Sequence, residues 1–219
     1  MATILVTGAN RGIGLEITRQ LTARGDEVIA ACRTPSDGLK AVGCRVEGGI
    51  DVADDGADAL AQRIADVQLD GLINNAGILR PDGLGAIDLV GIREQFEVNA
   101  IGPLRMTVAL LPRLKEGAKV AIVTSRMGSL ADNTSGGMYG YRMSKAAVNM
   151  VGRSLAHDLR PRGIAVGLLH PGFVQTEMTG GSGNVTPQES ARGLIERFDA
   201  LSMESSGTFF HANGETLPW

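Results

Sequence analysis

The chain has 219 residues, 43% hydrophobic and 21% charged, which is typical of one globular domain and unlike disordered, collagen-like or coiled-coil chains. Its formal net charge of −3 argues against a broad nucleic-acid-binding surface. Cys32 and Cys44 form no C-x-x-C pair and the three histidines show no metal-ligand spacing, so no metal site is expected. No apolar run approaches the roughly 18 residues that span a bilayer, and the N-terminus does not resemble a signal peptide. The sequence therefore predicts a cytoplasmic protein without membrane association.

Short apolar runs alternate with segments of helical period along the chain. Strands are expected at 2–7, 28–32, 44–47, 71–74, 120–124 and 164–169, and the main helices at 13–24, 94–114 and 138–159. Strands that alternate with helices pair in parallel through right-handed crossovers. The pattern predicts a single-domain α/β fold, a Rossmann-type doubly wound parallel sheet of about seven strands with helices on both faces.

A late helix is predicted to begin at Thr186-Pro187-Gln188-Glu189, where Thr186 and Glu189 have the spacing of a capping box and proline occupies the first helical position. The glycine-rich stretch 180–184 precedes it. This composition favours a short substrate lid near 173–186, with an ordinary surface loop as the alternative.

A glycine-rich turn joins the first strand to the first helix. Free N–H groups at a helix N-terminus bind phosphates, and glycines let the ligand approach the backbone closely. A plain turn is the alternative for the glycines alone, and the absence of Gly-Lys-Ser/Thr excludes a P-loop. We predict that this turn binds a dinucleotide through Gly8, Asn10, Arg11, Gly12, Ile13 and Gly14.

The end of the second strand indicates which dinucleotide is bound. An acidic residue there accepts the ribose 2′-hydroxyl of NAD, whereas this strand ends Ala31-Cys32-Arg33. Arg33 and Arg11 are suited to grip a 2′-phosphate through charge-assisted hydrogen bonds, although solvated surface arginines are the alternative. The sequence thus favours NADP(H), with NAD(H) as the second choice.

Tyr141 and Lys145 lie four residues apart on one predicted helix face. An ammonium beside a phenol favours the phenolate and brings the phenol closer to useful proton transfer, although such a pair also occurs on ordinary helix surfaces. Ser125 ends a strand at the sheet edge where ligands bind, and it lacks the Gly-x-Ser-x-Gly elbow of hydrolases. These residues favour an oxidoreductase over a hydrolase.

In this order along the chain, the motifs resemble the short-chain dehydrogenase/reductase family. The stretch 124–129, Asp132-Asn133-Thr134 and the final Gly214-x-x-Leu217-Pro218-Trp219 resemble its small carbonyl-reductase branch, which includes the C-factor and sniffer proteins. The resemblance implies four catalytic residues. Tyr141 is the proton donor, Ser125 hydrogen-bonds the substrate oxygen, Lys145 holds the nicotinamide ribose and stabilises the phenolate, and Asn99 supports a proton relay.

The resemblance also implies further cofactor contacts beyond the glycine turn. These are Asp51, Val52, Asn75, Ala76, Gly77, Tyr141, Lys145, Pro171, Gly172, Val174 and Thr176. It implies a homodimer or homotetramer formed through the helices near 94–114 and 138–159. Met127, Phe173 and Met178 are candidates for an apolar substrate pocket, with core packing as the alternative.

The predicted activity is NADPH-dependent reduction of a small-molecule aldehyde or ketone to an alcohol by hydride transfer. A cofactor-binding signalling or regulatory protein of C-factor type, with incidental catalysis, is the first alternative. A nucleotide-binding module without chemistry is the second.

Overall fold

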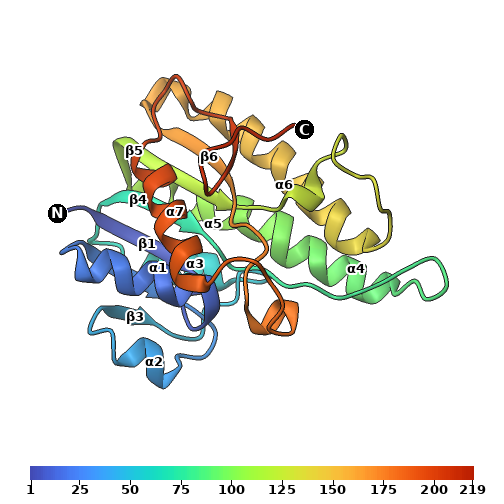
Figure 1. Cartoon of the computed structure of the whole chain (residues 1–219). Helices are drawn as coiled ribbons and strands as arrows, with labels where there is room; N and C mark the ends of the chain where they lie inside the picture. The colour runs from blue at the N-terminus through green and yellow to red at the C-terminus, as the bar shows by residue number, and fades with distance from the viewer.

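The computed structural model describes all 219 residues and is built around one parallel sheet of seven strands in the order β3-β2-β1-β4-β5-β6-β7 (Figure 1). The strands are β1 (Thr3–Thr7), β2 (Glu27–Ala31), β3 (Arg45–Glu47), β4 (Leu69–Asn74), β5 (Leu114–Val123), β6 (Ala165–His170) and β7 (Phe209–His211). The chain order reverses between β1 and β4, which is where ligands bind in doubly wound sheets. The predicted fold class is confirmed.

Helices cover both faces of the sheet. They are α1 (Gly12–Ala23), α2 (Asp37–Lys40), α3 (Gly56–Arg63), α4 (Leu89–Phe96), α5 (Gly102–Leu110), α6 (Tyr139–Asp158) and α7 (Pro187–Asp199), with single turns η1 (Glu97–Ile101), η2 (Leu111–Arg113), η3 (Arg126–Gly128), η4 (Arg160–Arg162) and η5 (Glu177–Thr179). In Figure 1 α1 and α7 lie side by side on one face, and α5 and α6 lie on the other. None of the helices combines the length and apolar character that crossing a bilayer requires.

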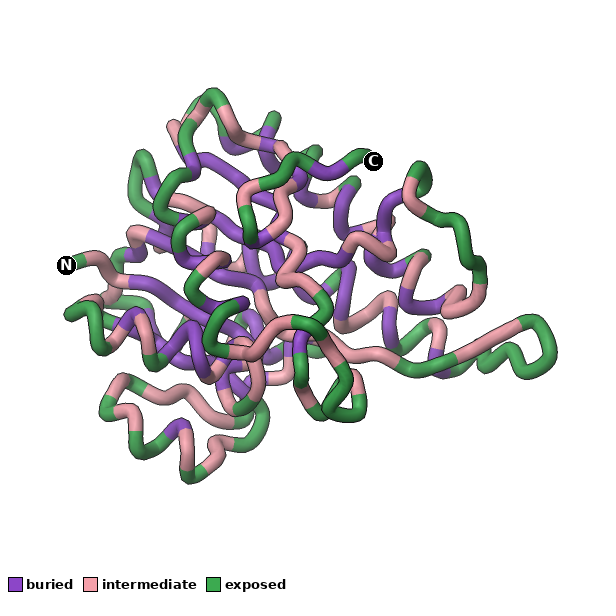
Figure 2. The backbone as a smooth tube through the Cα atoms, viewed as in Figure 1, coloured by how far each residue is buried: buried purple, intermediate pink, exposed green.

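Alternation along the strands divides the interior into two cores. Ile4 and Val6 of β1 belong to the core with Ile17 of α1, whereas Leu5 between them joins Met106 of α5 in the opposite core. The central strands are almost entirely buried in Figure 2. Burial of each large aliphatic side chain contributes roughly 1.5–3 kcal/mol, so the two cores together hold the sheet edge that carries the site.

Most predicted elements are found within a few residues of their predicted limits, and the largest difference concerns the helix expected at 94–114. This segment begins earlier, at Leu89, and is interrupted by the π-helical turn η1 before α5 ends at Leu110. β5 also begins six residues before the predicted strand. The first half of β5 shows no apolar pattern, because Lys115 and Glu116 are exposed, so the sequence indicates only its second half. The short elements α2, α3 and β7 lie outside the predicted ranges.

The capping box at Thr186 is confirmed. The Thr186 hydroxyl accepts a hydrogen bond from the Glu189 N–H at 3.2 Å, and the Glu189 carboxylate accepts one from the Thr186 N–H at 2.9 Å. The segment 173–186, where a lid is predicted, contains one helical turn, η5, and is closed at its base by pairing of Val174 with Val185. This segment therefore has its own local structure and stands next to the start of α7.

Candidate active site

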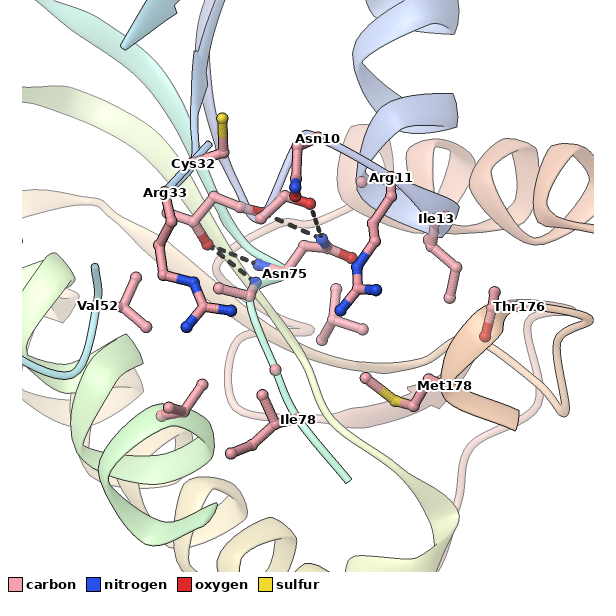
Figure 3. Close-up of a pocket in the computed structure, with 18 of the residues that line it drawn as sticks. Asn10, Arg11, Ile13, Cys32, Arg33, Val52, Asn75, Ile78, Thr176 and Met178 are labelled. Atoms are coloured by element: carbon pink, nitrogen blue, oxygen red, sulfur yellow. Dashed lines mark hydrogen bonds between the residues drawn. The ribbon is translucent and has the colours of Figure 1, made fainter. Parts of the chain in front are cut away.

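A cleft of about 670 Å³ opens at the carboxyl ends of the central strands, and Figure 3 shows part of its lining. Its volume lies within the usual range for ligand sites. The predicted cofactor residues on its wall are Gly8, Asn10, Arg11, Gly12, Ile13, Gly14, Arg33, Asp51, Val52, Asn75, Ala76, Gly77, Tyr141, Lys145, Pro171 and Thr176. Four predicted residues lie outside the lining, namely Asn99, Ser125, Gly172 and Val174. The structure therefore brings most of the predicted site together in one place.

The glycine turn is pressed against the end of β4. Gly8 has a φ of +65°, and a Cβ there would lie 2.8 Å from the Ala76 Cα. A Cβ on Gly14 would lie 2.3 Å from the Gly8 carbonyl oxygen. No side chain caps α1 and its first turn has no acidic residue, so the N–H groups of that turn remain available to a phosphate. This arrangement fits the pyrophosphate of a dinucleotide.

Asn75 fixes the turn from the neighbouring strand. Its Nδ2 donates to the carbonyl oxygens of Thr7 at 3.0 Å and Gly8 at 3.2 Å (Figure 3). The Thr7 hydroxyl in turn accepts the N–H groups of Asn75 at 3.0 Å and Ala76 at 3.1 Å. Asn75 thus holds the backbone of the glycine turn in place, and Thr7, which precedes Gly8, completes the connection.

Ser36, which was not predicted to belong to the site, also holds the glycine turn in place. Its hydroxyl donates to the Asn10 carbonyl oxygen at 2.6 Å and accepts the N–H of Leu39 at 3.1 Å as the cap of α2. The glycine turn is therefore tied to α2 as well as to β4. A serine in a short polar loop carries no sequence signal for this role, because the contact joins residues 26 positions apart.

The two arginines predicted to select NADP(H) pair with different carboxylates. Arg33 Nη1 lies 3.6 Å from Asp51 Oδ2, and Arg11 forms an ion pair with Glu177 of η5. Both side chains project into the cleft in Figure 3, Arg33 beside Val52 and Arg11 toward the side where Thr176 and Met178 lie. Arg33 therefore lies on the same side of the cleft as Asp51, and Arg11 connects the glycine turn to η5.

Tyr141 and Lys145 are both buried on the inner face of α6. Lys145 Nζ lies 5.7 Å from the centre of the Tyr141 ring and donates to the Val123 carbonyl oxygen at 2.9 Å. The Ser125 side chain lies close enough to the Tyr141 hydroxyl to lower its pKa, and Ser125 Oγ accepts the N–H of Met127 at 3.1 Å. The three residues meet between the end of β5 and the start of α6.

The electrostatics of the pair differ from the sequence expectation. Burial raises the pKa of Tyr141 to about 12, opposed by the hydrogen bond to Ser125. Burial also lowers the pKa of Lys145 to about 8. In the free chain, desolvation therefore outweighs the attraction between ammonium and phenolate, and Tyr141 keeps its proton at neutral pH. A buried phenol that retains its proton is suited to proton donation.

Asn99 lies in η1, close to Gly77. Its Oδ1 accepts the Ile78 N–H at 2.8 Å, while its Nδ2 donates to the Ile78 carbonyl oxygen at 2.8 Å and to Ser144 Oγ at 3.0 Å. A Cβ on Gly77 would lie 3.3 Å from Asn99 Oδ1 and 3.8 Å from Lys145 Nζ. Gly77 thus leaves a small space between the amide and the ammonium group, where the predicted relay would pass.

The predicted nicotinamide segment follows β6. The Pro171 carbonyl oxygen accepts the hydroxyl of Ser190 at 2.8 Å, Gly172 has a φ of +90°, and Val174 is buried. Phe173 is 51% exposed and Met178 is 42% exposed, so core packing does not explain either side chain. Met178 lines the cleft, whereas Met127 lines a separate small pocket on the other side of α6.

The family assignment follows from comparison with known proteins. Residues 2–185 match the family described as short chain dehydrogenase. A 1-hydroxy-2-glutathionyl-2-methyl-3-butene dehydrogenase of Rhodococcus sp. strain AD45 is 50% identical over 226 residues, covering 100% of both chains. C-signal of Myxococcus xanthus is 49% identical over 164 residues, covering 74% of this chain and 99% of that protein.

A solved structure has the same overall fold. The NADPH-bound carbonyl reductase from chicken fatty liver superposes with a TM-score of 0.90 at 33% identity, covering 100% of this chain and 99% of that one. The chain belongs to the short-chain dehydrogenase family. It is an oxidoreductase of the carbonyl reductase-like kind that uses a nicotinamide cofactor, and the predicted resemblance is confirmed.

Proposed function

We propose that the protein is an NADPH-dependent carbonyl reductase in which Tyr141 gives a proton to the oxygen of an aldehyde or ketone. The observation that carries this proposal is the contact of Tyr141 with Ser125 at the cleft end where Lys145 is buried. The chicken carbonyl reductase is described as NADPH-bound, and Arg33 and Arg11 give this cleft two cations for a 2′-phosphate.

The proposed roles follow from the geometry. Ser125 and Tyr141 donate to the substrate oxygen, which stabilises the charge that develops there. Lys145 has one protein acceptor, the Val123 carbonyl oxygen, so its other N–H bonds are free for the ribose hydroxyls. Asn99, whose amide is held by the backbone of Ile78, supports a water that leads protons from Lys145 to solvent. The bound cofactor supplies the hydride, and the protein supplies orientation and exclusion of water.

The test is NADPH oxidation by the purified protein with a panel of aldehydes, ketones and diketones. The panel includes carbonyl derivatives of glutathione conjugates, because the Rhodococcus relative is described as a dehydrogenase of a glutathionyl alcohol. We expect turnover that Tyr141→Phe abolishes while NADPH affinity changes little. Turnover by the Tyr141→Phe variant at the wild-type rate would contradict the proposal.

A second candidate is a cofactor-dependent signalling protein, favoured by the 49% identity to C-signal. Tight NADPH binding without oxidation by any carbonyl of a broad panel would move the assignment to this class. The proximity of Ser125, Tyr141 and Lys145 in one cluster supports the enzyme instead.

We also propose that the chain forms a homodimer or homotetramer through α4, α5 and α6. Exposed apolar side chains on these helices support this surface, namely Leu89, Val90, Leu104, Val108, Met143 and Met150. Light scattering of the wild type and of Val108→Glu tests it, and a wild type that elutes as a monomer at all concentrations would contradict it.

A further inference from the structure

The segment 78–82 runs from β4 toward the start of α4, and alternate residues are bonded to the helices beside it. Asn99 holds both peptide groups of Ile78. One turn earlier, Gln95 does the same for Arg80, whose N–H donates to Gln95 Oε1 at 3.0 Å and whose carbonyl oxygen accepts Gln95 Nε2 at 3.3 Å. Two side-chain amides thus replace the backbone pairing that a neighbouring strand would provide.

Gln95 also touches the first turn of α6. A Cβ on Gly140 would lie 2.5 Å from Gln95 Nε2 and 3.2 Å from the Ile92 Cα. Gln95 is 1% exposed, so its amide is enclosed between the 78–82 segment and α6. Tyr141 directly follows Gly140, so the residue that carries the catalytic phenol is adjacent in the chain to this contact.

Asp82 completes the connection by capping α6. Its carbonyl oxygen accepts the Met138 N–H at 3.0 Å, and its Oδ2 accepts the Gly140 N–H at 2.9 Å. Met138, at the N-cap position, has a φ of +51° and no side chain that caps. The carboxylate of Asp82 therefore takes the part of an N-cap side chain, and its negative charge suits the N-terminus of a helix.

We propose that Gln95 and Asp82 are positioning residues that fix the first turn of α6 and thereby hold the Tyr141 hydroxyl against Ser125. This inference rests on the proposed function, since it requires Tyr141 to be the proton donor. The next turn of α6 is anchored separately, through Lys145 to Val123 and through Asn149 to Thr124. Loss of either positioning residue therefore displaces Tyr141 more than Lys145.

The experiment uses the full chain with Gln95→Leu, Asp82→Ala and Asp82→Asn. A displacement of about 1 Å at a catalytic group costs up to about a hundredfold in rate, so we expect kcat to fall about tenfold to a hundredfold in Gln95→Leu and Asp82→Ala. Neither residue lines the cleft, so the NADPH dissociation constant should change less than about twofold. Asp82→Asn keeps an acceptor oxygen for Gly140 and should restore most of kcat.

A second readout does not depend on activity. The chain has two tyrosines, so phenolate absorbance in a Tyr139→Phe background reports Tyr141 alone. Burial holds the pKa of Tyr141 at about 12, and a displaced ring gains solvent, so Gln95→Leu should lower this pKa toward its ordinary value. Gln95→Leu changes no charge, which separates displacement from the loss of a nearby carboxylate in Asp82→Ala.

Ile64→Val is the control for lost stability, because Ile64 is buried at the end of α3 and does not line the cleft. It should lower the melting temperature and leave kcat and the Tyr141 titration unchanged. Gln95→Leu and Asp82→Ala variants that lose stability but keep wild-type kcat and titration would overturn the inference, and so would an Asp82→Asn variant as slow as Asp82→Ala. A Tyr141→Phe variant that keeps the wild-type rate would instead contradict the proposed function, so the two failures are distinguishable.

Discussion

Lys145 donates to the carbonyl oxygen of Val123 at 2.9 Å, and this bond joins the middle of the catalytic helix to the strand end that presents Ser125. Gly128 packs closely against the backbone of Lys145, since a Cβ on Gly128 would lie 2.6 Å from the Lys145 carbonyl carbon. Tyr141 stands one turn before Lys145 on α6. The three proposed catalytic side chains therefore share one corner between β5 and α6, which fixes their geometry before a substrate arrives.

The direction of the reaction is expected to depend on pH. Burial raises the pKa of Tyr141 to about 12, so the phenol is protonated at neutral pH and ready to donate to a carbonyl. Oxidation of the alcohol needs the phenolate, and its rate should therefore rise with pH between about 6 and about 10. The measurement is kcat/KM in both directions for one carbonyl and alcohol pair.

A matched control for this pH dependence is Ser125→Ala, which removes the hydrogen bond that lowers the pKa of Tyr141. It should slow both directions and move the rise in oxidation to higher pH. An oxidation rate that is independent of pH in the wild type would show that Tyr141 is not the group that titrates.

Lys145→Met is expected to stabilise the free protein at neutral pH while it abolishes turnover. The charged side chain is buried, and burial lowers its pKa from 10.5 to about 8, so the unfolded chain binds more protons than the folded one between these values. Wild-type stability therefore rises with pH from about 8 to about 10.5, and the advantage of the variant, full below about pH 8, shrinks over that range.

Chemical denaturation at several pH values measures this difference, with Lys115→Met as the control. Lys115 is partly exposed and pairs with Asp70 at 2.8 Å, so its replacement should give no gain at neutral pH. A Lys145→Met variant less stable than the wild type at pH 7 would show that packing of the lysine, rather than burial of its charge, dominates.

Strong local patterns explain why much of the fold could be predicted. Each central strand is a continuous apolar run, because both faces are covered by helices. The start of α7 was predictable because the capping box of Thr186 and Glu189 is a local signal. β7 gave no such signal, since Phe209–His211 is three residues long and gains its place by pairing with β6.

The site was predictable where a side chain lies at a fixed place relative to a strand or helix, as Ser125 and Tyr141 do. Contacts between distant segments were not predictable. The Thr7 hydroxyl bonds the backbone of residues 68 and 69 positions away, and Arg11 pairs with Glu177, 166 positions away. Spacing along the sequence carries no information about such partners, so the supporting residues emerge only from the three-dimensional structure.

Arg33→Ala should weaken NADPH binding and leave NADH binding nearly unchanged. Arg33 lines the cleft beside Asp51, and a hydrogen bond to a charged group contributes about 1.5–3 kcal/mol, which corresponds to about tenfold to a hundredfold in the dissociation constant. Arg11→Ala should show a smaller effect in the same direction, because Arg11 must leave Glu177 to reach a phosphate.

Titration of each variant with both cofactors measures the selectivity. Arg45→Ala is the control, because Arg45 lies on β3, pairs with Glu47 and does not line the cleft. Equal weakening of NADPH and NADH by Arg33→Ala would mean that the guanidinium supports the adenine end in general and does not read the 2′-phosphate.

Gly14→Ala should abolish cofactor binding, whereas Gly85→Ala should be neutral. A Cβ on Gly14 would lie 2.3 Å from the Gly8 carbonyl oxygen and 2.4 Å from Asn75 Nδ2, while nothing lies within 4 Å of a Cβ on Gly85. The added methyl group forces the cofactor turn away from β4, which costs about 1–3 kcal/mol of stability. NADPH titration together with thermal unfolding measures both effects. A Gly14→Ala variant that binds NADPH like the wild type would mean that the turn adapts to the methyl group and that its close packing is not needed for the cofactor.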